Sequence, residues 1–414
     1  MYFASTKRES PQNRKTRVFH LLGLSFLAAV AYVAPGNVAA NLTAGAQYGY
    51  LLVWVLVLAN AMAVIVQYQS AKLGIVTDSP LPHLLGQRFN KKSRLVFWAQ
   101  AEIVAAAIDL AEVIGGAIAL HLLFNVPLVT GGIIVGIVSL LLLMIQNRSG
   151  QIHFELVIIA LLVVITFGFL GGLFFAPPSA SGVLSGMVSR FEGVQTVLLV
   201  TSMLGATVTP HAIHLHSSLT RDRHADSEQD KETLLRASRV DVVWALIIAG
   251  AVNIGLLLLA ASALDGVEGT DTIEGAHAAI SQALGPTIGV IFAVGLLASG
   301  LASTSVGAYA GAEIMDGLLH IRIPLLVRRA VTLIPALIIL AVGAEPTWAL
   351  VVSQVVLSFG IPLAIIPLML YTRNAEIMGK FRDGPVLRWT ALVIAVVIVA
   401  LNIALIVLTA MGVE

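Results

Sequence analysis

The chain has 414 residues, of which 58% are hydrophobic and only 11% are charged, and its formal net charge is +1. Soluble domains carry about a quarter charged residues, so this composition excludes a soluble protein and predicts a polytopic membrane protein. The absence of cysteine excludes disulfides, thiolate metal sites and iron–sulfur clusters.

A short basic tail, residues 1–17, precedes the first long apolar stretch, which is too long for the core of a cleavable signal peptide. About 20 apolar residues are needed to cross the hydrocarbon core of a bilayer. By that measure the sequence predicts an all-α membrane protein with eleven transmembrane helices. They are expected at 18–47, 50–75, 95–124, 127–147, 153–176, 194–218, 237–264, 284–318, 325–343, 347–371 and 387–411.

The basic residues lie almost entirely in the loops on one side of these helices. If the N-terminus is cytoplasmic, only Arg190 of the 24 Lys and Arg residues falls on the opposite side, where the 265–274 loop carries four acids. Cytoplasmic loops carry an excess of Lys and Arg. We therefore expect a protein of the plasma (inner) membrane, with a cytoplasmic N-terminus and an extracytoplasmic C-terminus.

The first predicted helix is interrupted in its middle by the stretch AYVAPGNVAANL, residues 31–42. Pro35 removes a backbone donor and clashes with the preceding turn, and Gly36 adds backbone freedom. In lipid, such a break is tolerated only where the freed polar groups face protein or a water-filled cavity. The sequence thus predicts a helix break at this position.

Three acids lie within the third predicted helix: Glu102, Asp109 and Glu112. Their spacings of seven and three residues place them on one helix face. Ionisable residues at membrane depth are expensive and usually functional, so we expect this stripe to relay protons or pass cations. A purely structural buried network is the alternative. Arg328 and Arg329, which begin the ninth predicted helix, either pair with these acids or anchor that helix at the cytoplasmic surface.

The sixth predicted helix repeats the interruption of the first, with Gly205, Thr209, Pro210 and His211 in the stretch MLGATVTPHAIHLHSSL. Two breaks at matching positions of two five-helix halves indicate an inverted repeat with a substrate site at mid-membrane. Half-helix ends present unpaired carbonyls and amides, and carbonyls suit cations. Two ordinary proline kinks are the alternative. The predicted units are the tail, the two repeats and an additional C-terminal helix: 1–17, 18–176, 194–371 and 387–411.

Three histidines, His211, His214 and His216, follow the second break. A zinc peptidase is disfavoured because no glutamate accompanies them as in the HExxH motif. We instead expect His211 to titrate near neutral pH beside the break and His216 to lie on a proton route toward the cytoplasm.

Isolated polar residues occur in three other apolar helices: Asn253, Thr304 and Gln354. Each alone is more often an interhelical hydrogen bond than a substrate contact. Gln354, in the stretch SQVVLSFGIP, is the strongest candidate among them for a neutral oxygen ligand.

Together these stretches resemble the Nramp family of proton-coupled divalent metal transporters, in its bacterial manganese-type branch. The likeness extends from about residue 20 to residue 411 and includes PGNVAANLTAGAQYGY, AEIVAAAIDLAE, LLASGLASTSVGAYAG and SQVVLSFGIP. It implies a LeuT-type fold and uptake of Mn²⁺ or Fe²⁺ driven by protons. It also implies no cofactor, no enzymatic activity and no nucleic-acid partner; the partners are the metal ion, protons and the lipid bilayer.

The chain departs from the family pattern at two positions. The family's first-helix motif is Asp-Pro-Gly-Asn and its sixth-helix motif is Met-Pro-His, whereas this chain has Ala34 and Thr209 at the first position of each. In the family, the aspartate supplies the only full negative charge on the metal, and the sulfur favours softer transition metals. The resemblance implies a neutral, all-oxygen site here, formed by Ala31, Ala34, Asn37, Ala206, Thr209 and Gln354.

Three explanations of this departure remain open. The first is a transporter of altered selectivity, because all-oxygen sites suit hard, partly hydrated ions such as Mg²⁺. The family's magnesium-transporting branch also lacks the methionine, although it is not proton-coupled, whereas the acid stripe is intact here. The second is a non-transporting sensor or receptor-like relative, against which the lack of a soluble signalling domain counts. The third is an engineered double substitution in a manganese transporter.

Overall fold

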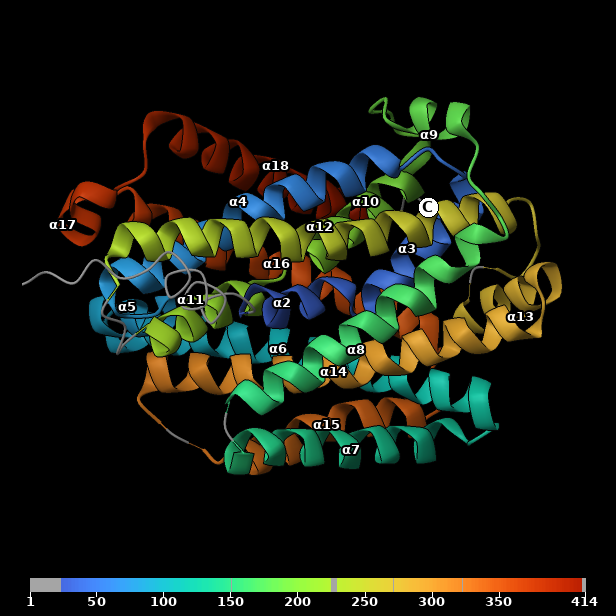
Figure 1. Ribbon diagram of the computed structural model, residues 1–414, viewed down its shortest axis with the longest axis horizontal. Helices are drawn as coiled ribbons and strands as arrows, with labels where there is room; N and C mark the ends of the chain where they lie inside the picture. The colour runs from blue at the N-terminus through green and yellow to red at the C-terminus, as the bar shows by residue number, and fades with distance from the viewer. Residues whose placement is uncertain (1–23, 150, 225–228, 271, 322, 412–414) are drawn as a thin grey trace, which may run out of the picture.

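The computed structural model describes residues 24–149, 151–224, 229–270, 272–321 and 323–411. Every regular element in these ranges is a helix, which confirms the all-α prediction for them (Figure 1). The predicted tail, 1–17, and the first six residues of the first predicted helix lie outside the described residues.

The long helices follow the order that the sequence predicts. They are α2 (Leu24–Ala29) with the 3₁₀ turn η1 (Val30–Val33) and α3 (Pro35–Tyr48), α4 (Val53–Thr77), α6 (Lys91–Phe124), α7 (Leu128–Ser149), α8 (Gln151–Leu170), α10 (Gly193–Thr207) with α11 (Pro210–His224), α12 (Lys231–Ala263), α14 (Pro286–Leu319), α15 (Leu325–Ala341), α16 (Pro346–Thr372) and α18 (Pro385–Ala410).

Short helical segments connect or extend the long ones. Apart from η2, which lies inside the predicted span 153–176, the sequence analysis did not predict them. They are α5 (Leu81–Arg88), η2 (Gly171–Phe174), α9 (Ala180–Gly186), α13 (Ile273–Leu284), α17 (Ala375–Met378) and η3 (Gly379–Phe381). Each is shorter than the roughly 20 residues that mark a membrane span, so a search for spans passes over them.

Eight helices in the described ranges are long and apolar enough to cross a membrane, and the bent pair of α2–η1 and α3 makes up to nine. The predicted spans at 127–147 and 325–343 correspond to α7 and α15. The apolar part of α7 is the shorter stretch Leu128–Met144, and α15 has 17 residues. The count of eleven spans therefore remains a prediction.

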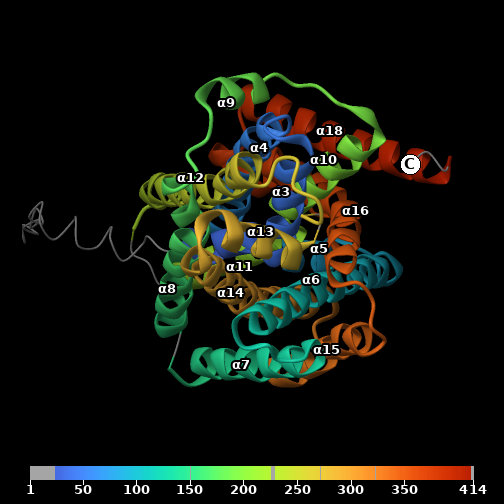
Figure 2. The ribbon, with the colours of Figure 1, turned by 90° about the vertical axis from the view of Figure 1, so that its right-hand side faces the viewer.

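The broken helices lie inside the bundle. Viewed end-on, α3 and α11 are surrounded by the other long helices, α7 and α15 lie side by side at one edge, and α18 lies at the opposite edge (Figure 2). Helix α14 packs along α6 and α8, next to the centre. Protein therefore surrounds both breaks, as an interrupted helix in a bilayer requires.

A proline begins the second half of each broken helix. Ala34 is extended (φ −68°, ψ 161°), Pro35 is the first residue of α3, and the two halves meet at a bend of 48°. Helix α10 ends at Thr207, and Pro210 is the first residue of α11. Proline is well suited to the first turn of a helix, where its missing N–H has no intrahelical acceptor, and it disfavours helical conformation in the residue before it. The breaks thus lie where Pro35, Gly36 and Pro210 predict them.

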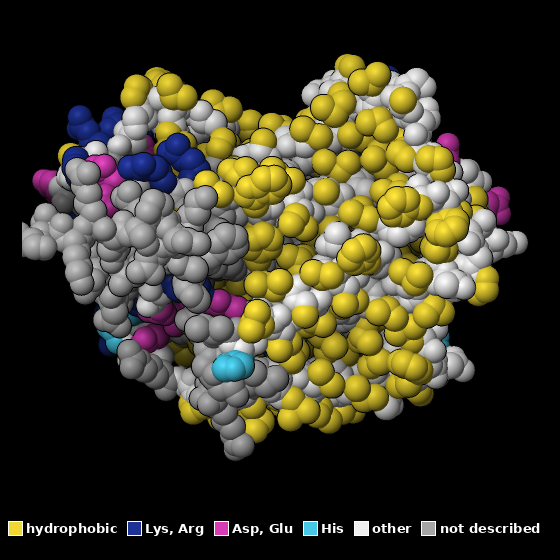
Figure 3. Space-filling model, viewed as in Figure 1, with side chains coloured by type: hydrophobic (Ala, Val, Ile, Leu, Met, Phe, Trp, Pro, Cys, Tyr) yellow, Lys and Arg dark blue, Asp and Glu magenta, His cyan; other side chains and the backbone are white. Residues whose placement is uncertain are grey.

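Charged and apolar side chains are separated on the surface. Lys and Arg residues gather at one end of the molecule, near α17, and hydrophobic side chains cover much of the rest of the face in Figure 3. This separation agrees with the predicted placement of the basic loops on one side of the membrane.

Labelling of single cysteines tests the predicted orientation, since the chain has no cysteine of its own. We expect Glu268→Cys, in an exposed loop, to react with a membrane-impermeant maleimide on intact cells. Lys92→Cys, exposed at the start of α6, should react only after permeabilisation. The reverse pattern would invert the topology. Asp271, in the same loop as Glu268, lies outside the described residues.

Candidate metal-binding site

Side chains of two neighbouring helices donate hydrogen bonds to the backbone carbonyls at the first break. Ser299 Oγ of α14 donates to the Val33 carbonyl at 2.5 Å, and Ser303 Oγ donates to the Val30 carbonyl at 3.3 Å. Asn253 Nδ2 of α12 donates to the Tyr32 carbonyl at 2.6 Å. Among the described residues, no side chain donates to the carbonyl of Ala31, which lies between them. These bonds stabilise η1 and leave the Ala31 carbonyl, a predicted metal ligand, without a side-chain donor in the described part of the chain.

Gln354 of α16 lies against both breaks. A β-carbon placed on Gly36 would lie 1.8 Å from Gln354 Nε2, and one placed on Gly205 would lie 2.7 Å from the Gln354 carbonyl oxygen. Only glycine permits these approaches, because any larger residue would displace the glutamine. The structure thus brings the tenth predicted helix onto the first and sixth, as the resemblance implies.

Two buried oxygens at the breaks have no hydrogen-bond partner in the described part of the chain: Asn37 Oδ1 and Thr209 Oγ1. The side chains of Asn37, Thr209 and Gln354 are all at most 3% exposed. Buried polar atoms are nearly always satisfied by protein, water or an ion. No described protein group satisfies these two oxygens, which makes them candidate ligands of an ion or of water.

The candidate metal ligands at the breaks are all uncharged. Ala31, Ala34 and Ala206 offer only backbone carbonyls, and the Ala34 carbonyl already accepts from the Asn37 and Val38 amides at 2.9 and 3.2 Å. No group of three or more His, Asp or Glu side chains in the described ranges is arranged to hold a metal ion. Carbonyl, amide and hydroxyl oxygens are the ligands of hard cations, which keep part of their water shell.

The acid stripe of α6 pairs with the two arginines of α15. Arg328 holds Glu102 through two hydrogen bonds of 2.6 and 2.9 Å, and Arg329 lies 2.7 Å from Asp109. The second pair is almost completely buried, and Arg329 Nε also donates to Ser139 Oγ at 3.0 Å. Both arginines therefore pair with the acids, as one of the two expectations held, rather than serving only as a cytoplasmic anchor. Their role in proton transfer stays a prediction.

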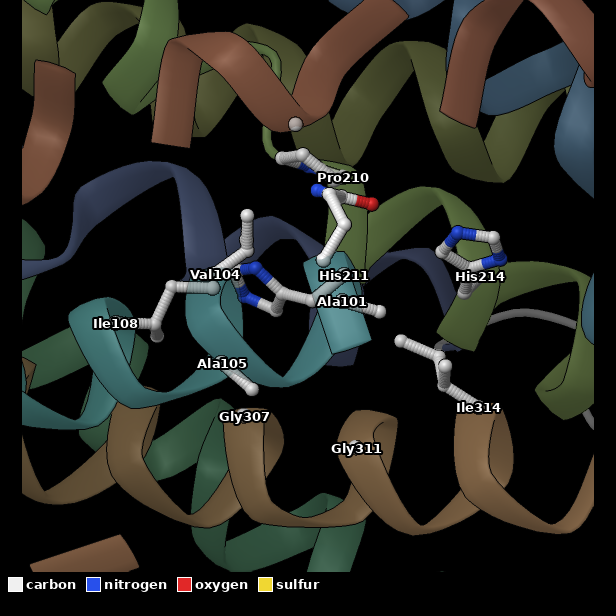
Figure 4. Close-up of a pocket in the computed structure, with 12 residues that line it drawn as sticks. Ala101, Val104, Ala105, Ile108, Pro210, His211, His214, Gly307, Gly311 and Ile314 are labelled. Carbon is white, nitrogen blue, oxygen red and sulfur yellow. The ribbon is translucent and has the colours of Figure 1, made fainter. Parts of the chain in front are cut away.

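A small cavity of about 10 Å³ separates the second break from the acid stripe. Pro210, His211 and His214 line it from α11, while Val104 and Ile108 line it from α6, with Gly307 and Gly311 of α14 opposite (Figure 4). This volume holds roughly one water.

His211 lines this cavity, and neither of its ring nitrogens has a hydrogen-bond partner among the described residues. Glu112 does not line the cavity but lies close to its wall. A β-carbon on Gly307, in the cavity wall, would lie 3.3 Å from Glu112 Oε2. His211 and Glu112 thus lie on two sides of the wall that Gly307 forms.

His216 belongs to a different environment. Its Nδ1 lies 2.8 Å from Gln67 Oε1, its Nε2 lies 3.3 Å from Ser25 Oγ, and Gln67 Nε2 also donates to the Tyr32 hydroxyl. It thus links α11 to α4 and α2 and lines no part of the cavity beside His211.

Three residues near the site escaped the sequence analysis as site residues: His214, Ser299 and Ser303. The stretch LASGLASTSVGAYAG contains both serines four residues apart, on one face of α14, and this spacing is the signal that would have found them. Asn253 was noticed only as an isolated polar group, and it acts as a donor to the break.

Comparison with known proteins gives a consistent result. The family model described as natural resistance-associated macrophage protein-like (Nramp) matches residues 25–408. The chain is 56% identical to the divalent metal cation transporter MntH of Mycobacterium tuberculosis, over 95% of this chain and 92% of that protein. It is 43% identical to the protein of the same name in Bacillus subtilis, over 93% and 91%.

Solved structures resemble it in the same way. A manganese transporter of Eremococcus coleocola, 28% identical, superposes with a TM-score of 0.86 over 96% of this chain and 88% of its own. Mhp1, a nucleobase-cation-symport-1 family transporter, and MhsT, at 16% and 15% identity, match with TM-scores of 0.55 and 0.57 over more than 90% of this chain. At such identities the last two show a shared LeuT-like fold alone.

Proposed function

The chain belongs to the Nramp family, and from that premise we propose that it is a secondary-active transporter of divalent metal ions. It is an integral membrane protein and not an enzyme. We place it in the plasma membrane with eleven spans, a cytoplasmic N-terminus and two inverted five-helix repeats at 18–176 and 194–371. The observation that carries the proposal is the pair of unpartnered buried oxygens, on Asn37 and Thr209, at two facing helix breaks.

The proposed substrate site lies between the two breaks. Carbonyls near Ala31 or Ala34 and of Ala206 and the side chains of Asn37 and Thr209 bind the ion, and Gln354 closes over it from α16. The approach of Gln354 to Gly36 supports this closing role. Rocking of one repeat against the other then exposes the site alternately to the two sides of the membrane.

The ligands at this site differ from those of the family's motifs, and we propose that the selectivity differs with them. In the family's Asp-Pro-Gly-Asn and Met-Pro-His motifs, a carboxylate and a thioether favour Mn²⁺ or Fe²⁺. Ala34 and Thr209 supply neither, so we propose weak binding with little discrimination between Mn²⁺ and Mg²⁺. An all-oxygen site with bound water suits Mg²⁺ at least as well as a transition metal.

The proposed proton route begins beside the metal site and leads away from it. It passes from His211 through the small cavity to Glu112, and then along Asp109 and Glu102 with their partners Arg329 and Arg328; His216 forms a second polar link between α11, α4 and α2. Without a carboxylate at position 34, nothing negatively charged joins this route to the metal. We therefore propose that proton flow is uncoupled from metal flow, or absent.

Uptake into proteoliposomes tests the function. With Mn²⁺, Cd²⁺ and Mg²⁺ outside and a pH dye inside, we expect slow, saturable uptake with half-saturation in the millimolar range, similar for all three ions. Internal acidification should not rise in proportion to the metal taken up. Stoichiometric acidification would show that position 34 is not the coupling position.

A single substitution locates the site in the same assay. Asn37→Ala removes the amide oxygen at the first break that has no partner among the described residues, and we expect it to abolish the remaining binding by calorimetry and the remaining uptake. Asn402→Ala, an amide on α18 that donates to the Ser358 carbonyl at 2.8 Å, is the matched control and should retain both. Unchanged metal binding in Asn37→Ala would move the site elsewhere. No saturable uptake of any ion by the unaltered protein would favour the non-transporting relative.

A further inference from the structure

A groove runs between α16 and α18 on the outside of the bundle, away from the breaks. Its apolar part has a volume of about 430 Å³ and is lined by aliphatic side chains, among them Ile366, Leu370, Val396 and Ile403. The side chains of all four are more than 40% exposed, so this part opens toward the region where lipid lies. Pockets of this size suit small organic ligands.

At one end the groove becomes polar. A second hollow of about 430 Å³ shares Met369, Arg373 and Leu392 with the first and adds Arg388 and Trp389. The side chain of Trp389 is 68% exposed, as in the aromatic belts that mark the membrane–water boundary. The groove therefore passes from an apolar channel to a pair of arginines at the level expected for lipid headgroups.

Neither arginine forms an ion pair with a carboxylate in the described part of the chain. Arg388 Nε donates to the Asp383 backbone carbonyl at 2.8 Å. This bond orients the guanidinium and leaves its two terminal nitrogens able to donate to a ligand. The carboxylate of Asp383 is already held by Lys72 Nζ at 2.8 Å and by Gln69 Nε2 at 2.9 Å. The charge of Arg373 and Arg388 is thus available for an anionic ligand.

The polar end of the groove is also rigidly built. Lys72, Gln69 and Asp383 are buried, and they join the start of α18 to α4 across more than 300 residues of sequence. Gln69 lines the hollow, and its hydrogen bond to Asp383 fixes the segment that carries Arg388 against α4.

We propose that this groove binds one anionic glycerophospholipid. Arg373 and Arg388 bind its phosphate, and one acyl chain lies in the apolar channel between α16 and α18. Basic pockets between transmembrane helices are a recurrent form of headgroup recognition. The continuous apolar channel favours a lipid over a free anion, since inorganic phosphate would leave it empty. This site is separate from the metal site and does not depend on it.

Native mass spectrometry of the full chain tests the proposal with an equal mixture of phosphatidylglycerol and phosphatidylcholine that carry the same acyl chains. We expect the unaltered protein to retain phosphatidylglycerol about tenfold more than phosphatidylcholine. Arg373→Gln should lower that ratio several-fold, and Arg373→Gln with Arg388→Gln should bring it close to one. Ala400→Phe, which fills the apolar channel and leaves both arginines, should reduce retention of both lipids.

Arg382→Gln is the matched control, because Arg382 is exposed on the same connecting segment but does not line the groove. It should leave the ratio unchanged. An equal loss in Arg382→Gln would show general attraction to a basic surface and overturn the site. So would the absence of any preference in the unaltered protein, or displacement of the lipid by millimolar inorganic phosphate.

Fluorescence gives the position of the bound lipid. Brominated acyl chains on phosphatidylglycerol should quench more emission in the unaltered protein than in Trp389→Phe, and the difference should vanish in the double arginine variant. Equal quenching in the unaltered protein and in Trp389→Phe would place the retained lipid elsewhere and overturn the proposal.

Discussion

Ala34→Asp combined with Thr209→Met is expected to raise the affinity for Mn²⁺ at least a hundredfold and to make it selective over Mg²⁺. A carboxylate facing a buried divalent ion restores a charge-assisted contact, and a gain of about 3 kcal/mol corresponds to about a hundredfold in affinity. The methionine sulfur restores a preference for softer transition metals. Calorimetric titration with Mn²⁺, Cd²⁺ and Mg²⁺ measures both effects.

The structure supports the expectation that an aspartate at position 34 is tolerated. Ala34 is the N-cap of α3, is extended, and is only half-buried. Aspartate is among the residues preferred at this position, where its charge also interacts favourably with the helix N-terminus. The breaks themselves are set by Pro35, Gly36 and Pro210, which the two substitutions leave unchanged.

The single variants separate the two contributions. Ala34→Asp alone should tighten the binding of all three ions and restore proton coupling in the liposome assay. Thr209→Met alone should change the order of affinity among Mn²⁺, Cd²⁺ and Mg²⁺, with little gain in the affinity for any of them. If the double variant folds and still prefers no transition metal, the departure from the family extends beyond these two residues.

The main features of the site could be predicted because they depend on local chemistry. Proline in an apolar helix favours a break where glycine or polar residues accompany it, so Pro35 and Pro210 located both breaks. Proline alone does not force one, since Pro335, Pro362 and Pro367 lie inside the continuous helices α15 and α16. Acids spaced by three and seven residues lie on one helix face irrespective of the rest of the fold. Two adjacent arginines at the start of the ninth predicted helix offered natural partners for those acids, and both pairs form.

Features that depend on contacts between distant helices could not be predicted. The resemblance placed Gln354 at the breaks, but no pattern in the residues themselves shows this contact with Gly36. Nothing in the sequence shows that Lys72 pairs with Asp383 more than 300 residues away. Helix α13 is short and lies between predicted spans, so a threshold of membrane-spanning length passes over it. His211 and His216 share one stretch of sequence but lie in different surroundings, which follows from the helices packed against each face of α11.

Arg329→Gln is expected to be among the most destabilising single substitutions in the chain. The Arg329 side chain is 0% exposed and its partner Asp109 is 4% exposed, so the substitution leaves a buried carboxylate without its counter-charge. Removing one member of a buried ion pair costs about 3–5 kcal/mol. We expect a large fall in the midpoint of thermal unfolding of the purified protein in detergent, together with lower yield.

Two further variants identify the unpaired charge as the cause. Arg328→Gln is the matched control, because its partner Glu102 has a side chain that is 25% exposed and water can solvate the carboxylate; the cost should be about 1 kcal/mol. Asp109→Asn added to Arg329→Gln removes the unpaired buried charge. The double variant should regain most of the decrease in the thermal unfolding midpoint, because uncharged partners of similar shape carry no penalty for burying a charge. If Arg329→Gln is as mild as Arg328→Gln, or if Asp109→Asn rescues nothing, the buried pair does not stabilise the contact between α6 and α15. The proton route through Asp109 would then need a different structural basis.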